Sequence, residues 1–101
     1  MASFPILELE VIRWAEARKI IPNSTPLAQF TKAVSEMGEL ADALSKKNTH
    51  DIQDAVGDVT VCLINMCALL DINFTDCLEM AYLQIKDRKG TLMPSGVFVK
   101  E

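Results

Sequence analysis

A run of residues near the middle of the chain is apolar on almost every side. The run Val59–Leu70 includes Thr60 and Asn65 and is flanked by Asp58 and Asp71. It is shorter than the ~20 residues that cross a bilayer, and a helix without a polar face has to be buried on several sides. Four short helices can hardly enclose one of their own number. We therefore expect a bundle completed by a second copy, with this helix near the dimer axis; the alternative is a central helix in a compact monomer.

Capping and breaking residues divide the chain into four expected helices and a tail. Ser3, Thr25, Thr49 and Thr75 are placed to begin helices, with proline in the first turn of the first two, and Gly90 is placed to end the last. An apolar residue recurs every three or four positions after Pro26, which predicts a helical stripe. The fold class predicted is all-α, a single domain over 1–101, with helices at about 4–20, 26–46, 50–70 and 76–88 and an extended tail over 91–101. The stripe residues are Leu27, Phe30, Val34, Met37, Ala41 and Leu44.

Composition excludes several classes of protein. Half of the 101 residues are hydrophobic, which is too many for a disordered acidic tail, and the net charge of −4 makes the chain a poor binder of nucleic acid. No targeting or membrane-spanning segment is expected. An odd number of cysteines without a CxxC spacing, two of them in the apolar run, predicts reduced and buried thiols and a cytoplasmic protein; these are Cys62, Cys67 and Cys77.

Carboxylates line up on the second and third expected helices. Glu36 and Glu39 are about 60° apart around their helix, and Asp54 and Asp58 about 40° apart around theirs. The short connection makes the two helices antiparallel neighbours, and Asn65 continues the line from Asp58. The spacing predicts that these carboxylates face one another.

Carboxylates on helices usually form a solvated face, which is the alternative to a site. Clustered carboxylates repel one another unless a cation neutralises them, and oxygen ligands favour Mg²⁺, with Mn²⁺ as a substitute. A di-iron bundle would need Glu-x-x-His pairs, and His50 is the chain's one histidine. Gly38 and Gly57 stand beside the carboxylates in mid-helix, where glycine indicates the close approach of another helix or a ligand.

Basic residues gather at the end of the fourth expected helix. Lys86, Arg88 and Lys89 follow Tyr82. They either stabilise the helix C-terminus or hold phosphate. Lys32, one turn before Glu36, is either its ion-pair partner or a further phosphate contact. Two aromatic residues, Trp14 and Phe30, are expected to lie in the core rather than to serve as platforms on which a base stacks.

Three segments, in order, resemble the MazG-like branch of the all-α nucleoside triphosphate pyrophosphohydrolases. They are KAVSEMGELADAL (32–44), DIQDAVGDVTVCLINMCALL (51–70) and CLEMAYLQIKDRKGTLMPSGVFVKE (77–101). The resemblance is closest to the short single-domain versions of phages and bacteria. It implies a bundle that forms a homodimer or homotetramer. It also implies Mg²⁺-dependent cleavage of a nucleoside or deoxynucleoside triphosphate between the α- and β-phosphates, which yields the monophosphate and pyrophosphate.

The family pattern is Glu-x-x-Glu, a spacer, then Glu-x-x-Asp. Glu36 and Glu39 match its first half and Asp58 its last position, whereas Ala55 stands where the third ligand belongs. Asp54, one residue earlier, is the expected substitute. By this resemblance these four carboxylates hold Mg²⁺ and orient or deprotonate the attacking water. The expected substrate contacts are Lys86, Arg88 and Lys89 on phosphate, Lys32 as a further phosphate contact, and Asn65 and Tyr82 on sugar or base.

Two other functions stay open at this point. The same carboxylates would serve a non-catalytic dimeric module that binds a nucleotide or a protein, and the altered third ligand at Ala55 favours this alternative. A purely structural acidic bundle is the third possibility.

Overall fold

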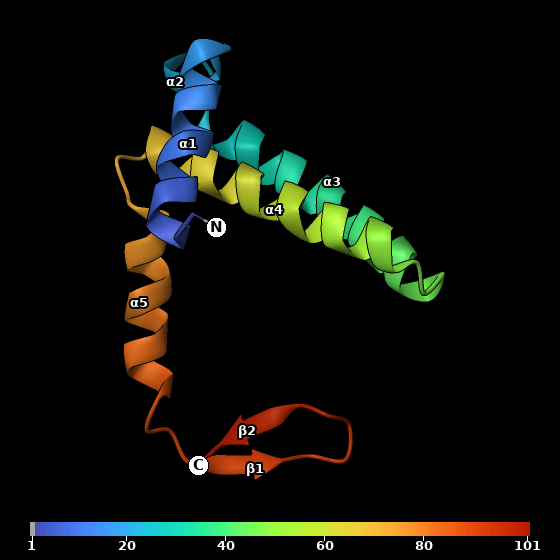
Figure 1. Ribbon diagram of the computed structural model, residues 1–101. Helices are drawn as coiled ribbons and strands as arrows, with labels where there is room; N and C mark the ends of the chain where they lie inside the picture. Colours follow the sequence, from blue (N-terminus) through green and yellow to red (C-terminus); the bar gives the residue numbers. More distant parts are fainter. Residues whose placement is uncertain (1) are drawn as a thin grey trace.

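The structure, a computed structural model, describes residues 2–101 as five helices followed by one two-stranded antiparallel sheet (Figure 1). The predicted all-α class is confirmed, with a small β addition at the C-terminus. The elements are α1 (Phe4–Ala17), α2 (Ile20–Asn23), α3 (Pro26–Ser45), α4 (Thr49–Leu69), α5 (Phe74–Ile85), β1 (Gly90–Leu92) and β2 (Phe98–Lys100).

The first expected helix, 4–20, is two elements. α1 ends at Ala17 because Lys19 takes up the left-handed conformation, with φ of 64°. The short α2 that follows is irregular, since Ile21 and Pro22 have non-helical dihedral angles. A regular helix tolerates proline only in its first turn. The bend at this point redirects the chain from α1 into α3.

Asparagines rather than threonines begin α4 and α5. Asn48, not Thr49, caps α4, and Asn73 caps α5, each with a side-chain oxygen that accepts a backbone N–H three residues on. The fourth helix therefore begins at Phe74 instead of 76, and it ends at Ile85 instead of 88. Asparagine is at least as good an N-cap as threonine, so the earlier residue starts the helix. The Thr25 cap of α3 is confirmed.

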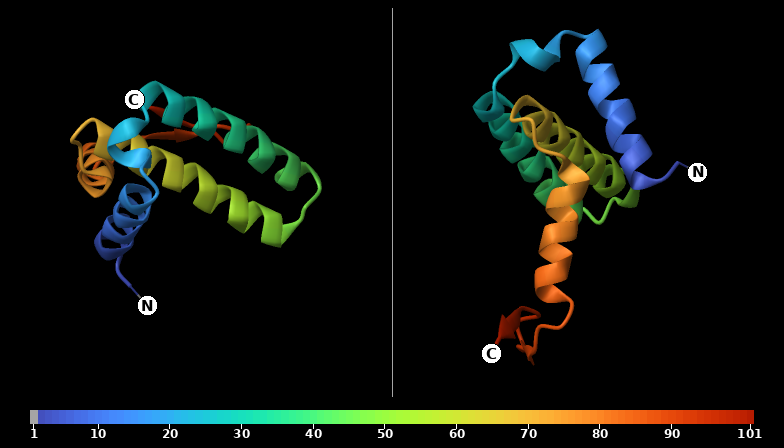
Figure 2. Two further views of the ribbon diagram at one scale, coloured as in Figure 1. Left: turned by 90° about the horizontal axis from the view of Figure 1, so that it is seen from above. Right: turned by 90° about the vertical axis from the view of Figure 1, so that its left-hand side faces the viewer.

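α3 and α4 form a long antiparallel pair, and α1 crosses α4 (Figures 1 and 2). Small side chains at the contact, Ala33 and Ala43 on α3 and Ala55 on α4, are at most 5% exposed. Small residues let two helix backbones approach closely. The carboxylates that flank these alanines are thereby held on neighbouring turns of two rigid helices.

The apolar stripe of α3 does not face α4. Leu27 and Val34, for example, are 73% and 54% exposed, and Phe30, Met37 and Leu44 are about as open. The face that packs is Ala33, Glu36, Leu40 and Ala43, one position before each of four stripe residues, which is about 100° around the helix. The stripe that predicted the helix is thus an uncovered surface. Phe30, expected in the core, lies on it.

α4 is only partly enclosed. Cys62, Ile64, Asn65 and Cys67 are buried, but Val56 is half exposed, and so is Leu70, which follows the last residue of the helix. By length and mean hydropathy (1.4) α4 meets the criterion for a membrane span, a criterion that core helices of water-soluble proteins also meet. The full burial expected for this helix is therefore not achieved by the folded chain of residues 2–101.

α5 leads away from the other helices, and none of its residues is buried. Its N-terminus is fixed to α1 by the buried carboxylate of Glu8, which accepts the N–H groups of Phe74 (2.7 Å) and Thr75 (2.9 Å) and the Thr75 hydroxyl. The Phe4 and Phe74 rings stack beside it, with centroids 5.8 Å apart. Cys77, on the first turn of α5, is exposed, which corrects the expectation that the thiols are buried; Cys62 and Cys67 are.

The tail, expected to be extended, folds into a β-hairpin. Gly90 pairs with Lys100 and Leu92 with Phe98, and Gly96 in the connection has φ of 89°, which glycine adopts without strain. No helix of residues 2–101 packs against this hairpin. One chain consequently does not close a four-helix bundle. We call the segment 74–101, α5 and the hairpin together, the arm.

Candidate functional site

Glu36 is the most enclosed of the predicted site carboxylates. It lies on the packing face of α3 and is only 7% exposed. Its Oε1 accepts an ion-pair contact from Lys32 Nζ at 3.2 Å, one turn earlier. Its Oε2 is buried and has no hydrogen-bond partner. A buried carboxylate oxygen without a partner is costly, so this atom is a place for a shared proton, a water molecule or a cation.

Glu36 and Glu39 influence each other's ionisation. The pKa of Glu36 is lowered, first by its interaction with the Glu39 carboxyl and then by Lys32. The pKa of Glu39 is raised by that same interaction and by the negative charge of Glu36. Two carboxyls this close favour holding one proton between them over being fully ionised together. The spacing argument for this pair is thereby supported.

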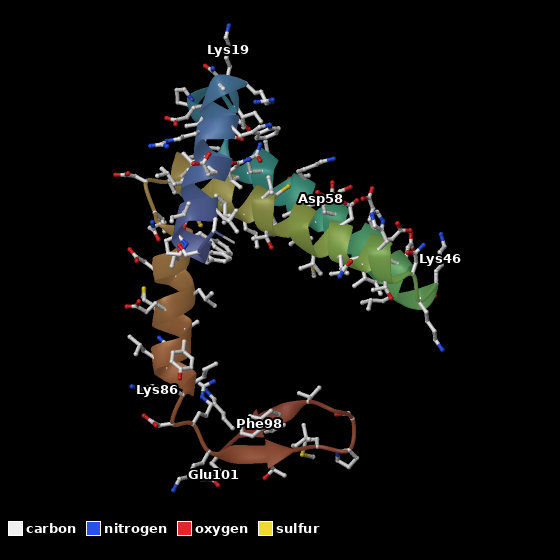
Figure 3. The ribbon with its side chains drawn as sticks, viewed as in Figure 1. Lys19, Lys46, Asp58, Lys86, Phe98 and Glu101 are labelled. Atoms are coloured by element: carbon white, nitrogen blue, oxygen red, sulfur yellow. The ribbon has the colours of Figure 1, made fainter. Side chains whose placement is uncertain are left out.

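Asp58 faces the same group from α4. Its pKa is raised, first by burial and then by the charges of Asp54 and Glu36. Asp58 lies on the long α3–α4 pair, well away from the end of α5 where Lys86 lies (Figure 3). The α4 carboxylates therefore add negative charge next to the Glu36–Glu39 pair, as the helical spacing predicted.

The four carboxylates open into two neighbouring cavities. Glu36 and Asp58 line one of about 380 Å³, and Glu39 and Asp54 line another of about 320 Å³. Within residues 2–101, no three side chains of histidine, cysteine, aspartate or glutamate converge into a ready-made metal-binding group. Ala55, at the family's third ligand position, is buried, whereas Asp54 is exposed. The carboxylates are brought to one region without being closed around a single point.

The cavity at Glu36 also contains Asn65, which the line of carboxylates on α4 predicted, and side chains of α1 and α3 that it did not predict. Asn65 is 2% exposed, and its Oδ1 has no hydrogen-bond partner. Trp14 and Gln29 line the same cavity, with Lys32 at its edge. Trp14 is 44% exposed, so the expectation that it is a core residue is wrong. The cavity thus offers one aromatic ring, one amide oxygen without a partner and one cation beside the carboxylates.

The crossing of α1 over α4 assembles this cavity. Trp14 comes from α1 and Gln29 from α3, so their meeting with Asn65 depends on a tertiary arrangement that periodicity does not report. Asn65 itself carried a signal, because an amide inside an apolar run has to find a partner. Trp14 carried a weaker one, as the chain's single tryptophan.

The basic residues at the end of α5 are not near the carboxylates of α3 and α4 in their own chain. Lys86, Arg88 and Lys89 follow the last turn of α5, at the end far from Asp58 (Figure 3). Among the described elements, α5 contacts only α1 and α4. Within residues 2–101 they form no ion pair. Tyr82 is exposed on α5. Of the predicted substrate contacts, only Lys32 and Asn65 line the cavity beside the carboxylates.

The chain is similar to one curated protein of a phage. It is 36% identical over 76 residues to the uncharacterized 18.2 kDa protein in the rep-hol intergenic region of Haemophilus phage HP1, strain HP1c1. That match covers 75% of this chain and 45% of the phage protein, so the chain spans less than half the length of its relative. No protein-family profile and no solved structure matches the chain.

Proposed function

We propose that the chain is a Mg²⁺-dependent nucleoside triphosphate pyrophosphohydrolase of the MazG-like type, which releases pyrophosphate and a nucleoside monophosphate. The observation that carries this proposal is Glu36, a buried carboxylate with an unpartnered Oε2, linked to a second carboxylate and facing a cavity with an unpartnered amide oxygen. Buried polar atoms are nearly always hydrogen-bonded, so two without a partner beside one cavity favour a ligand or an ion bound there. The choice of reaction rests on the resemblance of the three segments, in the same order, to the MazG-like pyrophosphohydrolases.

The side chains at the site fit Mg²⁺ by their chemistry. All of the candidate ligands are carboxylate oxygens, which hard divalent ions prefer, and Glu36 Oε2 lacks a partner. Glu36, Glu39 and Asp58 would hold the ion, with Asp54 in place of the family's glutamate. Bound there, Mg²⁺ would supply neutralisation of the triphosphate charge and polarisation of the attacked phosphorus.

The chain's own residues would handle the proton and the nucleoside. Glu39 has a raised pKa because Glu36 is beside it, and a carboxylate of higher pKa is the better base towards water. Lys32 would compensate phosphate charge at the cavity edge. Asn65 offers an amide oxygen to an N–H of the base, and the exposed Trp14 ring offers a surface on which the base stacks. These contacts would orient the substrate before cleavage.

A nucleotide panel tests this function. Purified protein is incubated with each common NTP and dNTP plus Mg²⁺ or Mn²⁺, and pyrophosphate is measured. We expect turnover of at least one nucleotide and a loss on the order of a hundredfold or more in Glu39→Gln, because that change removes a base and a ligand together. Glu16→Gln is the matched control, since Glu16 is an exposed α1 carboxylate outside both cavities. Absence of turnover with every nucleotide, or equal activity of the two variants, would contradict the proposal.

One alternative has an observation in its favour. Ala55 occupies the third ligand position, and no three ligand-type side chains converge within residues 2–101. A dimeric module that binds a nucleotide without hydrolysing it would be consistent with both observations. It predicts Mg²⁺-dependent nucleotide binding, measured by calorimetry, with no pyrophosphate released.

A further inference from the structure

The single chain exposes far more surface than a compact protein of its mass. Its accessible surface is 7656 Å², whereas a compact monomer of 11.2 kDa has about 5,700 Å². Its radius of gyration is 15.9 Å, against about 13 Å for a compact chain of this length. The excess of roughly 2,000 Å² is the area that each subunit contributes to a large obligate dimer.

Much of this excess belongs to the arm, whose surface is strongly apolar. Leu83, Ile85, Val97 and Phe98 are each at least half exposed, and nothing in residues 2–101 packs against the hairpin. An isolated two-stranded hairpin is marginally stable at best in water. The arm therefore has the composition of an interface and lacks a covering partner within its own chain.

A groove between α1 and α4 has the matching apolar lining. It consists of two adjoining cavities of about 420 and 260 Å³ that share Leu7, Val11 and Val61. Gly57 lies in its floor, and a Cβ placed there would meet no atom within 4 Å. The neighbour that this mid-helix glycine predicts is thus absent from the chain itself. At one end the groove reaches Asp58.

The distal part of the arm differs in charge from the end of the groove. Residues 86–101 carry four basic side chains (Lys86, Arg88, Lys89 and Lys100) against two acidic ones (Asp87 and Glu101), and none of the four makes an ion pair within residues 2–101. The groove ends at the carboxylates of α3 and α4, where Lys32 is the only cation paired with them among the described residues. Attraction between such surfaces fixes the direction in which one docks on the other.

We propose that the arm docks on a second copy of the chain, with its apolar side chains in the α1–α4 groove of that copy and its basic residues at that copy's carboxylates. In a two-fold dimer each copy gives an arm and receives one. The interface stands independently of any activity. The consequence that each carboxylate site receives its phosphate-binding cations from the other subunit rests on the proposed function.

Light scattering and crosslinking of the intact protein test the interface. We expect a mass of twice 11.2 kDa and a shift of Leu83→Glu to the monomer mass. Leu44→Glu is the matched control, because Leu44 is as exposed (56% against 54%) but lies at the distal end of α3; it should stay dimeric. A monomeric wild type, or a dimeric Leu83→Glu, would overturn the proposal.

The second measurement uses the wild-type chain, so it does not depend on whether a variant folds. Equal amounts of ¹⁴N- and ¹⁵N-labelled protein are refolded together and treated with a carbodiimide, which joins lysine amines to adjacent carboxylates. Mass spectrometry should find peptides of 86–89 joined to peptides of 36–58 in mixed ¹⁴N–¹⁵N pairs. Finding such crosslinks only within one isotope would show that the arm folds back on its own chain. No nucleotide is present, so failure here is separate from failure of the proposed activity.

Discussion

The α3–α4 pair and the arm are built from similar proportions of apolar residues, yet they differ in what covers them. Most of the buried side chains of residues 2–101 belong to α3 and α4, and none belongs to the arm. The pair places its carboxylates with its own contacts, at Ala33, Ala43 and Ala55. Among the described elements, the arm contacts α1, through Glu8 and Phe4, and α4, and it contacts no other element. One region is thus stabilised within the chain, and the other needs a partner.

Amide hydrogen exchange should show the largest difference between the two regions. In dilute protein we expect the central turns of α4, around 55–67, to exchange more slowly than 76–101 by a factor on the order of a hundred or more, because the buried turns have a higher free energy of opening. Each factor of ten in the exchange rate reflects about 1.4 kcal/mol of opening free energy. Raising the protein concentration should slow exchange in the arm far more than in α4, since α3 already protects α4 within one chain and the arm is covered only by a second copy. Equal protection of both regions at every concentration would show that the arm is stabilised by its own chain.

The junction between the regions depends on one carboxylate, so Glu8→Ala should have the next largest effect. It removes the acceptor of two N–H groups and one hydroxyl at the start of α5. Hydrogen bonds to charged groups contribute about 1.5–3 kcal/mol, and we expect a loss of about 2–3 kcal/mol in urea unfolding.

Glu10→Ala is the control for that change. Glu10 lies on the same helix, but its carboxylate is 62% exposed and only 3.8 Å from Arg13. Exposed helix pairs three or four residues apart contribute about 0.2–0.5 kcal/mol. A loss in Glu8→Ala no larger than that in Glu10→Ala would mean that the arm is not anchored through Glu8.

The sequence predicted the region that is locally determined and missed the rest. The facing of Glu36, Glu39 and Asp58 follows from the helical repeat and a short connection, and the structure places them in one region. The meeting of Trp14 and Gln29 with the predicted Asn65 was missed, because this cavity arises where α1 crosses α4. A crossing angle depends on the packing of whole helices rather than on spacing within one.

The apolar stripe of α3 shows a second limit of prediction from sequence. Its period correctly predicted a helix over 26–46, which the structure gives as Pro26–Ser45. Yet the stripe is exposed, and the adjacent face with Ala33 and Ala43 packs on α4. Periodicity reports that a face is apolar and is silent on which partner covers it. The same holds for the arm, where the sequence predicted a helix over 76–88 and an extended tail over 91–101 without reporting which surface covers their apolar residues.

Acid should weaken the anchor of the arm, with the smallest of the expected effects. Burial opposes the ionisation of Glu8, but the hydrogen bonds from Thr75 and Phe74 outweigh it and leave the pKa below its ordinary value. A carboxyl with a lowered pKa in the folded state contributes stability above its unfolded pKa, and that contribution disappears as the pH falls through the folded value.

We therefore expect the stability difference between wild type and Glu8→Gln to be constant near neutrality and to shrink below about pH 4.5. Urea unfolding of both proteins from pH 7 to pH 3 measures it, and the change must stay below the loss in Glu8→Ala, because a protonated carboxyl keeps part of the hydrogen bonding. If the stability difference instead grows on acidification, Glu8 must be protonated in the folded protein. Its hydrogen bonds to the first turn of α5 would then be those of a neutral carboxyl group.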